Sequence, residues 1–435
     1  MDDKDRGAPP DLAPPKGTTD LLPPESWRVS RLARLAMDTF AGAGYGPVDT
    51  PIFEHTEIFE RGVGATSEVV GKQMYTFTDR GGRSLTLRPE LTAPVVRAVL
   101  AANLQRGPLP VKLAYAGPMF RQERPQKGRY RQFYQVGIEA MGSALPAVDA
   151  EVIEIGSRFL ASAGVETTLL LNSIGHVDSS CRTGYLKLLV EYLEEQRDRL
   201  APVDAERVHT NPLRVFDSKE EATRAALEGA PYITDHLCDD CAKHFESVRT
   251  LLEDLGVGYE LEPRLVRGLD YYTRTAFEFV DAGGQQGKAA RLGSQNAFGG
   301  GGRYDGLAES LGGDALPGIG FALGLDRILI GAGGGPDDDV AKGPVNAYVV
   351  AIGAAAARPA LGLATRLRAS GLGVDLDLMG RSVKGQMKDA ARSGARWAVI
   401  LGDAEIASGE STLRDLTSGA ESRVALEDLA GLLAP

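Results

Sequence analysis

A short basic loop between two predicted strands is the part of the sequence best suited to bind a phosphorylated ligand. Between residues 121 and 131 it carries one acid, Glu123, and five basic residues, which are Arg121, Arg124, Lys127, Arg129 and Arg131. Pro125 and Gly128 interrupt any regular pattern, so the segment is expected to join the strands 111–120 and 131–139. Clustered arginines favour forked contacts to phosphate groups. The loop therefore predicts a phosphate site, with a solvated hairpin edge as the alternative.

The strand that follows this loop is expected to have one polar face. Side chains of a strand alternate between its two sides. One side offers a ring for stacking, an amide, a glycine that leaves room and a carboxylate, contributed by Phe133, Gln135, Gly137 and Glu139. The side chains between them are apolar or aromatic, which suits a core. One face of this strand is therefore predicted to be the floor of a ligand pocket.

Two more arginines occur in distinctive settings. Arg267 stands in LVRGLDYY, and Arg327 stands in LGLDRILI, which follows GIGFALG. The chain has no GxxxxGK[ST] sequence, so a nucleotide would be held mainly by arginines such as these and Arg121. Most single arginines are surface or ion-pair residues, and only the combination of three settings indicates a phosphate clamp.

Candidate ligands for an amino group or a ring lie in two other segments. Glu90 ends a predicted strand just before a helix whose first turn holds Pro94, and a carboxylate there can receive an ammonium group. The alternative is an acid that only complements the helix dipole. Tyr271 and Tyr272 could offer a hydroxyl to a buried ligand, although paired tyrosines in a strand more often pack in a core.

The cysteines give a weak metal signal. Cys238, Cys241 and His244 have ligand-like spacing, but the region favours a helix and has neither a second CxxC nor an evident fourth ligand. Buried thiols on a helix face are the favoured interpretation, and no metal ligand is predicted. The five histidines and the serines form no motif for nucleophilic catalysis, so covalent catalysis is not predicted.

Length and composition indicate a globular protein of two or three domains. The 435 residues are 43% hydrophobic and carry a net charge of −11, which argues against nucleic-acid binding over the whole surface but allows local basic patches. No apolar run is long enough to span a bilayer, and the acidic, proline-rich start shows no secretory pattern. Three cysteines cannot form a disulfide framework. A cytoplasmic protein without a membrane segment is therefore expected.

Local patterns divide the chain into segments. Residues 1–15 are predicted to be a disordered lead, and residues 16–330 an α+β domain. A helical, charge-rich insertion is expected at about 183–262. Glycine, proline and acids predict a linker at 331–344. Residues 345–435 then alternate as βαβαβ, which predicts a small α/β domain with a largely parallel sheet.

A series of basic residues recurs at helical steps in the last domain. If all of them lie on one helix, they form a single stripe of Arg381, Lys384, Lys388, Arg392 and Arg396. A solvated helix face is the usual explanation of such a stripe, and contact with an RNA backbone is the alternative.

At these motifs the sequence resembles the histidyl-tRNA synthetases, which are class II aminoacyl-tRNA synthetases, from about Lys16 to the C-terminus. The second class motif would be GPMFRQERPQKGRYRQFYQVGIE, and the third GIGFALGLDRIL. The two histidine-specific signatures would be LVRGLDYYTRTAFE and GGGRYDGL. Lys16 stands where arginine is common in the family. Leu91 stands where many bacterial members have glycine, so the resemblance does not predict the backbone conformation around Glu90.

The resemblance implies an α+β catalytic domain with an antiparallel active-site sheet and a helical insertion, followed by a C-terminal α/β anticodon-binding domain. It implies that ATP, with Mg2+, activates L-histidine to histidyl-adenylate, and that the histidyl group is transferred to tRNA(His). Arg121 and Arg267 would be the catalytic residues, holding the α-phosphate and the carboxylate. A homodimer is implied as well.

The resemblance also implies further site residues. The histidine ammonium would bind Glu90, Thr92 and Gln135. The imidazole would bind Glu139 and Tyr272, with Tyr271 beside them. In the ATP site, Glu123 would approach the adenine amino group and Arg129 would contact the phosphates. Phe133 and Arg327 would lie on the two faces of adenine. The tRNA would contact Gln126, Lys127, Arg131, Lys384 and Lys388.

Two other interpretations remain open at this point. A catalytically inactive, synthetase-like regulatory subunit of ATP phosphoribosyltransferase would share the catalytic-domain fold and sense histidine. The complete RGLDYY segment and the additional domain after Pro344 argue against it. A generic RNA-binding protein would explain the basic patches, but not the polar face of the strand.

Overall fold

The structure is a computed structural model that describes residues 12–64, 67, 69–176, 181–283, 296–333 and 345–434. Its contacts divide the chain into two compact units, whose main parts are Val29–Gly334 and Gly335–Pro435. Most of the predicted lead and linker falls outside the described residues. The first residues of the predicted linker belong to helix α10 (Leu325–Ala332), so there the sequence-based boundary was a few residues too early.

An eight-stranded sheet forms the centre of the first unit, in the order β1-β5-β6-β11-β10-β9-β7-β8. Its strands are β1 (Gly46–Pro47), β5 (Val111–Phe120), β6 (Gln132–Met141), β7 (Thr167–Ser173), β8 (Glu260–Leu261), β9 (Thr273–Asp281), β10 (Ala297–Arg303) and β11 (Gly318–Gly324). Neighbours from β5 to β7 all pair antiparallel, whereas the short edge strands β1 and β8 pair parallel. The predicted antiparallel sheet and the hairpin β5–β6 are therefore confirmed.

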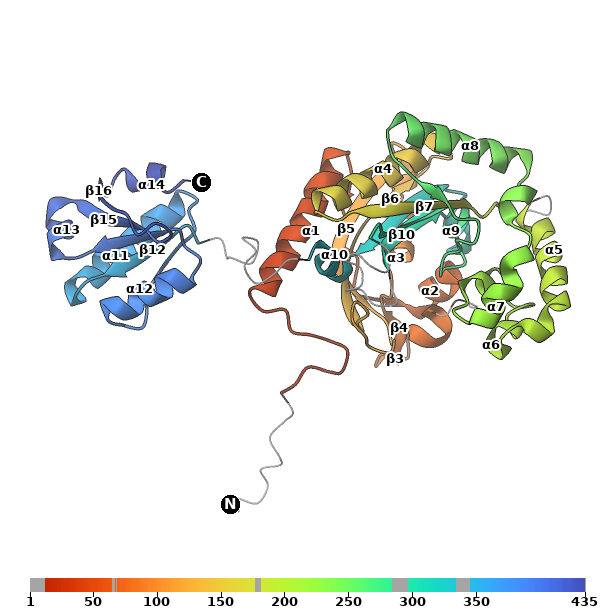
Figure 1. Cartoon of the computed structure of the whole chain (residues 1–435), viewed down its shortest axis with the longest axis horizontal. Helices are drawn as coiled ribbons and strands as arrows, with labels where there is room; N and C mark the ends of the chain where they lie inside the picture. Colours follow the sequence, from red (N-terminus) through yellow and green to blue (C-terminus); the bar gives the residue numbers. More distant parts are fainter. Residues whose placement is uncertain are drawn as a thin grey trace, which may run out of the picture. The chain divides into compact units, whose positions relative to one another are not determined.

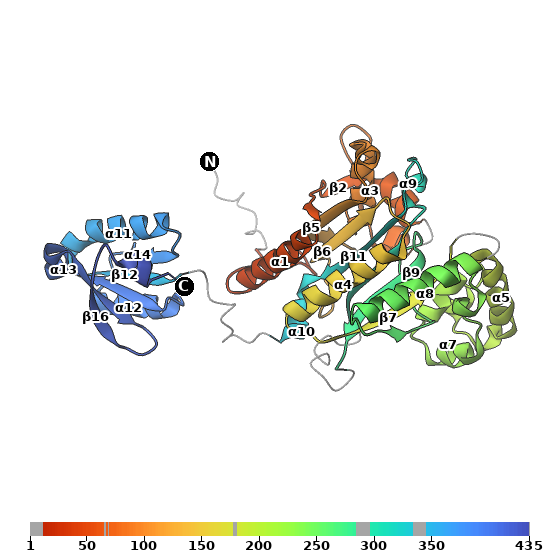
Figure 2. The ribbon, with the colours of Figure 1, turned by 90° about the horizontal axis from the view of Figure 1, so that it is seen from above.

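Three helices cover one face of this sheet: α1 (Glu25–Gly42), α4 (Pro146–Ser162) and α8 (Asp239–Asp254), as Figures 1 and 2 show. Phe40 of α1 meets Phe159 of α4 and Phe321 of β11 edge to face, each pair with ring centroids 5.7 Å apart. All three rings are buried. Burial of such rings contributes strongly to stability, so this face is the core and the other face of the sheet is left for a site.

A buried ionic network ties α4 to the sheet and to α8. Asp149 of α4 pairs with Arg303 at the end of β10. It also accepts hydrogen bonds from Thr275 Oγ1 at 2.6 Å and His244 Nε2 at 2.8 Å. Burial alone would raise the pKa of Asp149, but His244 and Arg303 outweigh it and the pKa is lowered. The network therefore needs the ionised carboxylate.

Asp149→Ala is expected to lower the free energy of unfolding by about 3–5 kcal/mol, because it leaves the Arg303 charge buried without its partner. Urea unfolding followed by circular dichroism measures the change. Glu154→Ala is the matched control on the same helix, since Glu154 pairs with Arg158 at the surface, and it should change stability by less than about 0.5 kcal/mol. Equal effects of the two substitutions would contradict a structural role for the buried network.

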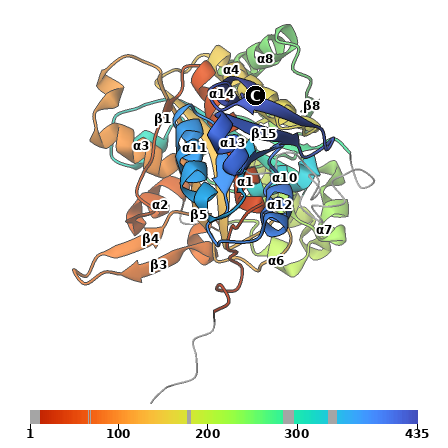
Figure 3. The ribbon, with the colours of Figure 1, turned by 90° about the vertical axis from the view of Figure 1, so that its left-hand side faces the viewer.

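A small three-stranded sheet and two helices flank the large sheet. The strand order of the small sheet is β2-β4-β3, with β2 (Phe53–His55), β3 (Tyr75–Thr78) and β4 (Ser84–Leu87). The β3–β4 hairpin extends away from the unit (Figure 3). The helices are α2 (Thr56–Val63), which a short π-helix follows (Val69–Gln73), and α3 (Thr92–Ala101), which a 3-10 turn follows (Leu104–Arg106). The predicted helix over 91–105 is thus shorter, although Pro94 does lie in its first turn.

Short helices with their own apolar core lie between β7 and α8, and Figure 1 shows them in green. They are α5 (Arg182–Glu195), α6 (Pro202–Ala205) and α7 (Glu221–Ala226), joined by 3-10 turns (Arg197–Arg199, Pro212–Asp217, Leu227–Gly229 and Ile233–His236). The sequence predicted helical structure here, and the structure has it. Helix α8, however, is not part of this group. It packs on α4, so at α8 the chain has returned to the sheet.

A mixed five-stranded sheet forms the second unit, in the order β13-β12-β14-β15-β16. The strands are β12 (Ala347–Ala351), β13 (Val374–Leu376), β14 (Trp397–Leu401), β15 (Glu410–Asp415) and β16 (Glu421–Ala425). Helices α11 (Ala357–Ala369) and α12 (Val383–Arg392) contact β12, and the short helices α13 (Asp403–Ser408) and α14 (Leu429–Leu432) complete the unit. The parallel pairing of β12 with β13 and β14 was predicted, whereas the antiparallel β15 and β16 were not.

The predicted basic stripe is interrupted in the structure. Helix α12 holds Lys384, Lys388 and Arg392, but Arg381 precedes the helix and Arg396 follows it. Arg381 pairs with Asp377 and Asp389 instead. The condition for a five-residue stripe, that all five residues lie on one helix, is therefore not met, because the helix is too short. Among the helices that the structure describes, none is both long and apolar enough to cross a membrane.

Candidate active site

A cavity opens on the face of the large sheet opposite α4, over β6, β9, β10 and β11. Strand alternation explains its position, because Phe279 of β9 faces α4 at Gly156 while Glu278 faces the cavity. The predicted site residues that line it are Glu90, Thr92, Arg121, Glu123, Arg129, Phe133, Gln135, Arg267, Tyr271, Tyr272 and Arg327. The tertiary fold thus brings together residues from four segments that are distant in the sequence.

Two arginines line the cavity, Arg121 just after β5 and Arg267 in the segment before β9. Arg121 donates from Nε to the Pro89 carbonyl at 2.9 Å, and its guanidinium lies 5.2 Å from the centroid of the Phe133 ring. Burial lowers the pKa of Arg121, yet an arginine remains charged. Arg267 donates from Nη1 to Glu278 Oε1 at 2.5 Å. Burial alone would lower the pKa of Arg267, but Glu278 and Tyr272 outweigh it and the pKa is raised.

The residues expected around adenine and the phosphates also meet here. Arg327 is anchored by its own hydrogen bonds, from Nε to the Gly128 carbonyl at 3.0 Å and from Nη1 to the Ala297 carbonyl at 2.9 Å. Burial, followed by the charges of neighbouring arginines, lowers the pKa of Arg327. Glu123 and Arg129 form an ion pair with each other in this structure. Four arginines and four carboxylates line the cavity, so it can bind both the anionic and the cationic groups of a ligand.

The start of α3 shapes the other end of the cavity. The Glu90 carboxylate accepts hydrogen bonds from the main-chain N–H groups of Thr92 at 2.7 Å and Ala93 at 3.1 Å. Burial raises the pKa of Glu90. Leu91 has φ −117° and ψ −12°, which any L-residue adopts. The leucine at this position therefore leaves the backbone around Glu90 unstrained.

Glu139 lies beneath the cavity rather than in its wall, since its exposed fraction is 0%. Its carboxylate accepts hydrogen bonds from Thr92 Oγ1 at 2.7 Å, Tyr115 Oη at 3.3 Å and Tyr304 Oη at 2.6 Å. Burial, to which the charge of Glu90 adds, raises the pKa of Glu139 to about 8. A Cβ at Gly320 on the neighbouring strand would overlap the carboxylate, so only glycine fits there.

Two polar atoms at the cavity are buried without a hydrogen-bond partner in the part of the chain that the structure describes. They are Gln135 Oε1 and Arg267 Nε. Buried polar groups normally have partners, and an unpaired one costs about 1–3 kcal/mol. Gly300 of β10 keeps the space beside Arg267 open, because a Cβ there would lie 3.0 Å from Arg267 Nη1. The cavity is therefore shaped for a ligand that both accepts and donates hydrogen bonds.

Comparison with known proteins places this site in a family. The family model for histidyl-tRNA synthetase matches residues 17–328, and a model for an anticodon binding domain matches residues 346–434. The chain belongs to the histidyl-tRNA synthetase family. Its first unit is accordingly a class II synthetase catalytic domain, and its second unit is an anticodon-binding domain.

Full-length relatives agree with this family. The chain is 48% identical over 422 residues to the histidine–tRNA ligase of Desulforudis audaxviator, covering 96% of this chain and 97% of the relative. It is 45% identical over 424 residues to the histidine–tRNA ligase of Halothermothrix orenii, covering 96% and 98%. A solved structure of S. aureus histidyl-tRNA synthetase superposes with a TM-score of 0.78 at 36% identity and covers 97% of this chain and 99% of its own.

Within this histidyl-tRNA synthetase fold, sequence reasoning missed residues that support the site. Glu278 pairs with Arg267, and Tyr115 and Tyr304 hold Glu139. A signal for Glu278 was present, because an acid between Phe277 and Phe279 in a strand must face away from a core. Tyr304 stands in the GGGRYDGL motif, but the motif did not indicate that its hydroxyl holds Glu139. No local pattern marked Tyr115, which is buried like an ordinary core residue.

The basic loop at the edge of the site forms a tight turn. Gln126 and Arg129 exchange main-chain hydrogen bonds of 3.0 and 2.9 Å, which leaves the exposed Lys127 next to Gly128 at the tip. Gln126 is also exposed. Arg131 donates to the main-chain carbonyls of Glu123 and Lys16, so its side chain holds the loop in place. In the second unit of this family member, Lys384 and Lys388 are exposed.

The structure separates His244 from the two cysteines with which it was grouped by spacing. His244 Nε2 bonds to Asp149, whereas Cys238 and Cys241 lie beside His176. The three-residue grouping was therefore wrong, because Asp149 of α4 binds the His244 imidazole and His176, which is distant in sequence, takes its place beside the cysteines.

Proposed function

We propose that the protein uses ATP to activate L-histidine as histidyl-adenylate and transfers the histidyl group to tRNA(His). Membership of the histidyl-tRNA synthetase family supports this function, as do full-length relatives named histidine–tRNA ligase. The observation at the site that carries it is the pair of unpartnered buried atoms, Gln135 Oε1 and Arg267 Nε, which face one cavity. An acceptor and a donor placed in this way suit an amino acid with its ammonium and carboxylate groups.

The proposed chemistry needs cations rather than a nucleophile from the enzyme. The histidine carboxylate attacks the α-phosphate of ATP, and pyrophosphate leaves, so two anions are brought together in the transition state. Arg121, which interacts with the charge of Glu90, and Arg267, which pairs with Glu278, both line the cavity and would offset this charge. Groups fixed before the reaction stabilise a developing charge at little reorganisation cost.

Histidine recognition would use both ends of the cavity floor. Glu90, Thr92 and Gln135 would receive the ammonium group, and Glu139 and Tyr272 would bind the imidazole nitrogens, with Tyr271 packed against Tyr272 at 4.7 Å between ring centroids. Glu139 would act from beneath the cavity, where its carboxylate is fixed by hydroxyl donors. A side chain without ring nitrogens would strand these buried polar groups, which explains discrimination against other amino acids.

ATP binding would use the basic end of the cavity. Phe133 and Arg327 would lie on the two faces of adenine, Glu123 would receive its amino group and Arg129 would contact the phosphates. This requires the Glu123–Arg129 ion pair to open when ATP binds. Mg2+ would be held with the nucleotide by oxygen ligands such as the Glu278 carboxylate, and when bound it would neutralise phosphate charge.

A histidine-dependent exchange of pyrophosphate into ATP tests the proposal. Each of the twenty amino acids is supplied in turn to the full-length protein, and only L-histidine should support rapid exchange. Absence of exchange with intact, folded protein would reject the enzyme. It would instead favour the regulatory subunit of ATP phosphoribosyltransferase, which the high identity to histidine–tRNA ligases disfavours.

Contacts to tRNA(His) would come from both units. Gln126, Lys127 and Arg131 of the basic loop would meet the acceptor end, and Lys384 and Lys388 of α12 would meet the anticodon arm. The support is the exposure of Lys127, Lys384 and Lys388, together with the anticodon-binding domain that the family model matches.

Deletion of the residues after Pro344 is expected to lower tRNA charging at least about tenfold more than adenylation, because it removes tRNA contacts but no cavity residue. Pyrophosphate exchange and aminoacylation on the same preparation measure the two steps. Equal losses would contradict an anticodon-binding role for the second unit, provided that circular dichroism shows a folded first unit.

A cytoplasmic homodimer is the proposed state of the protein. Exposed apolar side chains support self-association, since Ile52, Phe53 and Phe77 are 46%, 51% and 44% exposed and the two rings pack 6.4 Å apart. Light scattering after size-exclusion chromatography measures the mass, and a monomer at micromolar concentration would reject the dimer.

A further inference from the structure

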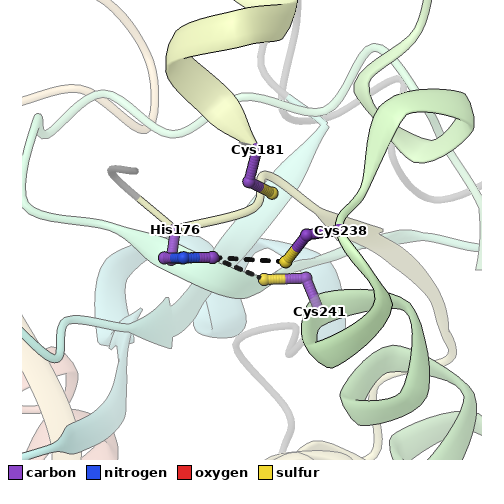
Figure 4. A group of neighbouring side chains, drawn as sticks. All are labelled: His176, Cys181, Cys238 and Cys241. Carbon is purple, nitrogen blue, oxygen red and sulfur yellow. Dashed lines mark hydrogen bonds between the residues drawn. The ribbon is translucent and has the colours of Figure 1, made fainter. Parts of the chain in front are cut away.

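Four potential metal ligands converge at the base of the helical insertion, away from the active-site cavity. They are His176, Cys181, Cys238 and Cys241, and their ligand atoms all lie within 4.8 Å of one another. Figure 4 shows the three sulfur atoms and the imidazole pointing toward a common centre. All three cysteines of the sequence therefore belong to one cluster with one of its five histidines.

The cluster is assembled from segments that are distant in the sequence. His176 follows β7, Cys181 directly precedes α5, and Cys238 and Cys241 lie at the start of α8. His176 and Cys241 are 65 positions apart, yet His176 Nδ1 lies 3.0 Å from Cys241 Sγ and 3.7 Å from Cys238 Sγ. Random convergence of every cysteine in the chain on one imidazole is not expected from core packing.

The donor types and distances fit tetrahedral zinc. Zinc prefers thiolate sulfur and imidazole nitrogen, with bonds of about 2.3 and 2.0 Å, so its ligand atoms lie about 3.5–3.8 Å apart. Of the two separations from His176 Nδ1, the 3.7 Å to Cys238 Sγ lies within that range and the 3.0 Å to Cys241 Sγ lies below it, so a small side-chain rotation would bring both into it. A soft, sulfur-rich donor set excludes magnesium or calcium as the natural occupant.

The backbone beneath the cluster is adapted to it. Gly175 has φ +63°, which favours glycine, and a Cβ at this position would lie 2.7 Å from Cys181 Sγ. Glycine therefore lets the chain turn from β7 and place His176 and the Cys181 sulfur on the same side. Cys181 and Cys241 are buried and Cys238 is half-buried, so solvent has limited access to the thiols.

We propose that His176, Cys181, Cys238 and Cys241 form a structural zinc site that fastens the two ends of the helical insertion to each other. All four positions of a tetrahedron are filled by protein ligands, and such closed sites are structural rather than catalytic. The insertion begins at Cys181 and its last short turn ends just before Cys238. One ion thus joins the chain where it leaves the catalytic sheet and where it returns.

The site also connects to the active-site cavity through the residue next to Cys181. Arg182 is buried and donates from Nε to the Ile174 carbonyl at 3.1 Å and from Nη2 to the Tyr272 carbonyl at 2.9 Å. Tyr272 lines the cavity. The zinc therefore helps to hold the main chain of a cavity residue, although none of its ligands lines the cavity.

Metal analysis of the full-length protein tests the proposal without relying on catalysis. Protein expressed with added zinc and dialysed against metal-free buffer is expected to retain about one zinc ion per chain. Inductively coupled plasma mass spectrometry measures the zinc content. Cys238→Ser and Cys181→Ser should each retain less than about a fifth of that amount. His209→Gln is the matched control, because His209 is exposed and pairs only at the surface, and it should keep all of the zinc.

A second measurement on the unmodified protein covers variants that fail to fold. Strong chelation should release the zinc and, in step with it, make the three thiols reactive toward a disulfide reagent. Trypsin should then cut within residues 182–238 at least about tenfold faster than in the zinc-bound protein. Cobalt in place of zinc should give the absorption of a tetrahedral thiolate complex.

Three outcomes would overturn the proposal. The first is wild-type protein that holds no zinc after expression with added metal. The second is zinc that remains at the same level in Cys238→Ser and Cys181→Ser, which shows that it binds elsewhere. The third is a disulfide between two of the cysteines in freshly purified protein, detected by mass after alkylation, because an oxidised pair cannot ligate the ion.

Discussion

Arg267→Ala is expected to lower the rate of histidine-dependent adenylation by about a thousandfold, while the protein stays folded. The guanidinium lies at the cavity with Nε unpartnered, and its position is fixed by the 2.5 Å contact to Glu278. Removal of one preorganised donor from a developing charge typically costs two to three orders of magnitude, about 10²–10³-fold. Single-turnover formation of histidyl-adenylate measures the effect without interference from product release.

Two controls separate catalysis from folding in this experiment. Arg264→Ala changes a nearby arginine that bonds to Tyr232 rather than to the cavity, and it should leave the rate within about twofold. Arg267→Lys keeps the charge beside Glu278 but loses the fork, so its rate should lie between those of wild type and alanine. Near-normal adenylation by Arg267→Ala would reject the catalytic role.

Glu139→Gln is expected to raise the KM for histidine by about a hundredfold or more. The carboxylate accepts hydrogen bonds from Thr92, Tyr115 and Tyr304, and an amide at this position would direct N–H groups at some of these donors. A buried site that loses a hydrogen-bond partner for its ligand loses about 10²-fold or more in specificity. Pyrophosphate exchange over a range of histidine concentrations gives KM and kcat separately.

The pH dependence of histidine binding gives a sharper test of Glu139. With its pKa raised to about 8 by burial, the free enzyme carries the proton at neutral pH. Free imidazole gains a proton below pH about 6.5. The complex needs one proton between carboxylate and ring, so affinity should be highest at pH about 6.5–8 and fall on either side. In Glu139→Gln, histidine affinity should no longer fall above pH about 8. If the affinity of this variant still falls there as in the wild type, Glu139 does not bind the ring.

The same carboxyl group also links stability to pH. Because the folded-state pKa of Glu139 is about 8, above the value of 4.5 for an unperturbed glutamate, the folded state binds the proton more tightly than the unfolded state. This contribution to stability is complete below pH 4.5 and is lost as the pH rises through about 8. Glu139→Gln should remove that part of the pH dependence, whereas Glu154→Gln on the protein surface should not.

The sequence by itself determined the local structure of the site. Alternation in β6 placed Phe133 and Gln135 in the cavity floor, and the charge of the preceding loop predicted an anion site beside them. The βαβ pattern of the second unit and the hairpin β5–β6 were also correct. The motifs further indicated the family that the comparisons then established. All of these features depend on residues close in sequence, whose geometry is set by the repeat of a strand or a helix.

Only the tertiary structure decided which distant residues meet. It paired Arg267 with Glu278 and set Glu139 beneath the cavity. In the structure His244 is hydrogen-bonded to Asp149, and His176 rather than His244 lies with the cysteines. Sheet order and helix packing fix such contacts, and neither appears in a local pattern. The residue types and their spacing therefore indicated what chemistry the chain can perform, while the order of the strands determined where the ligands for that chemistry converge.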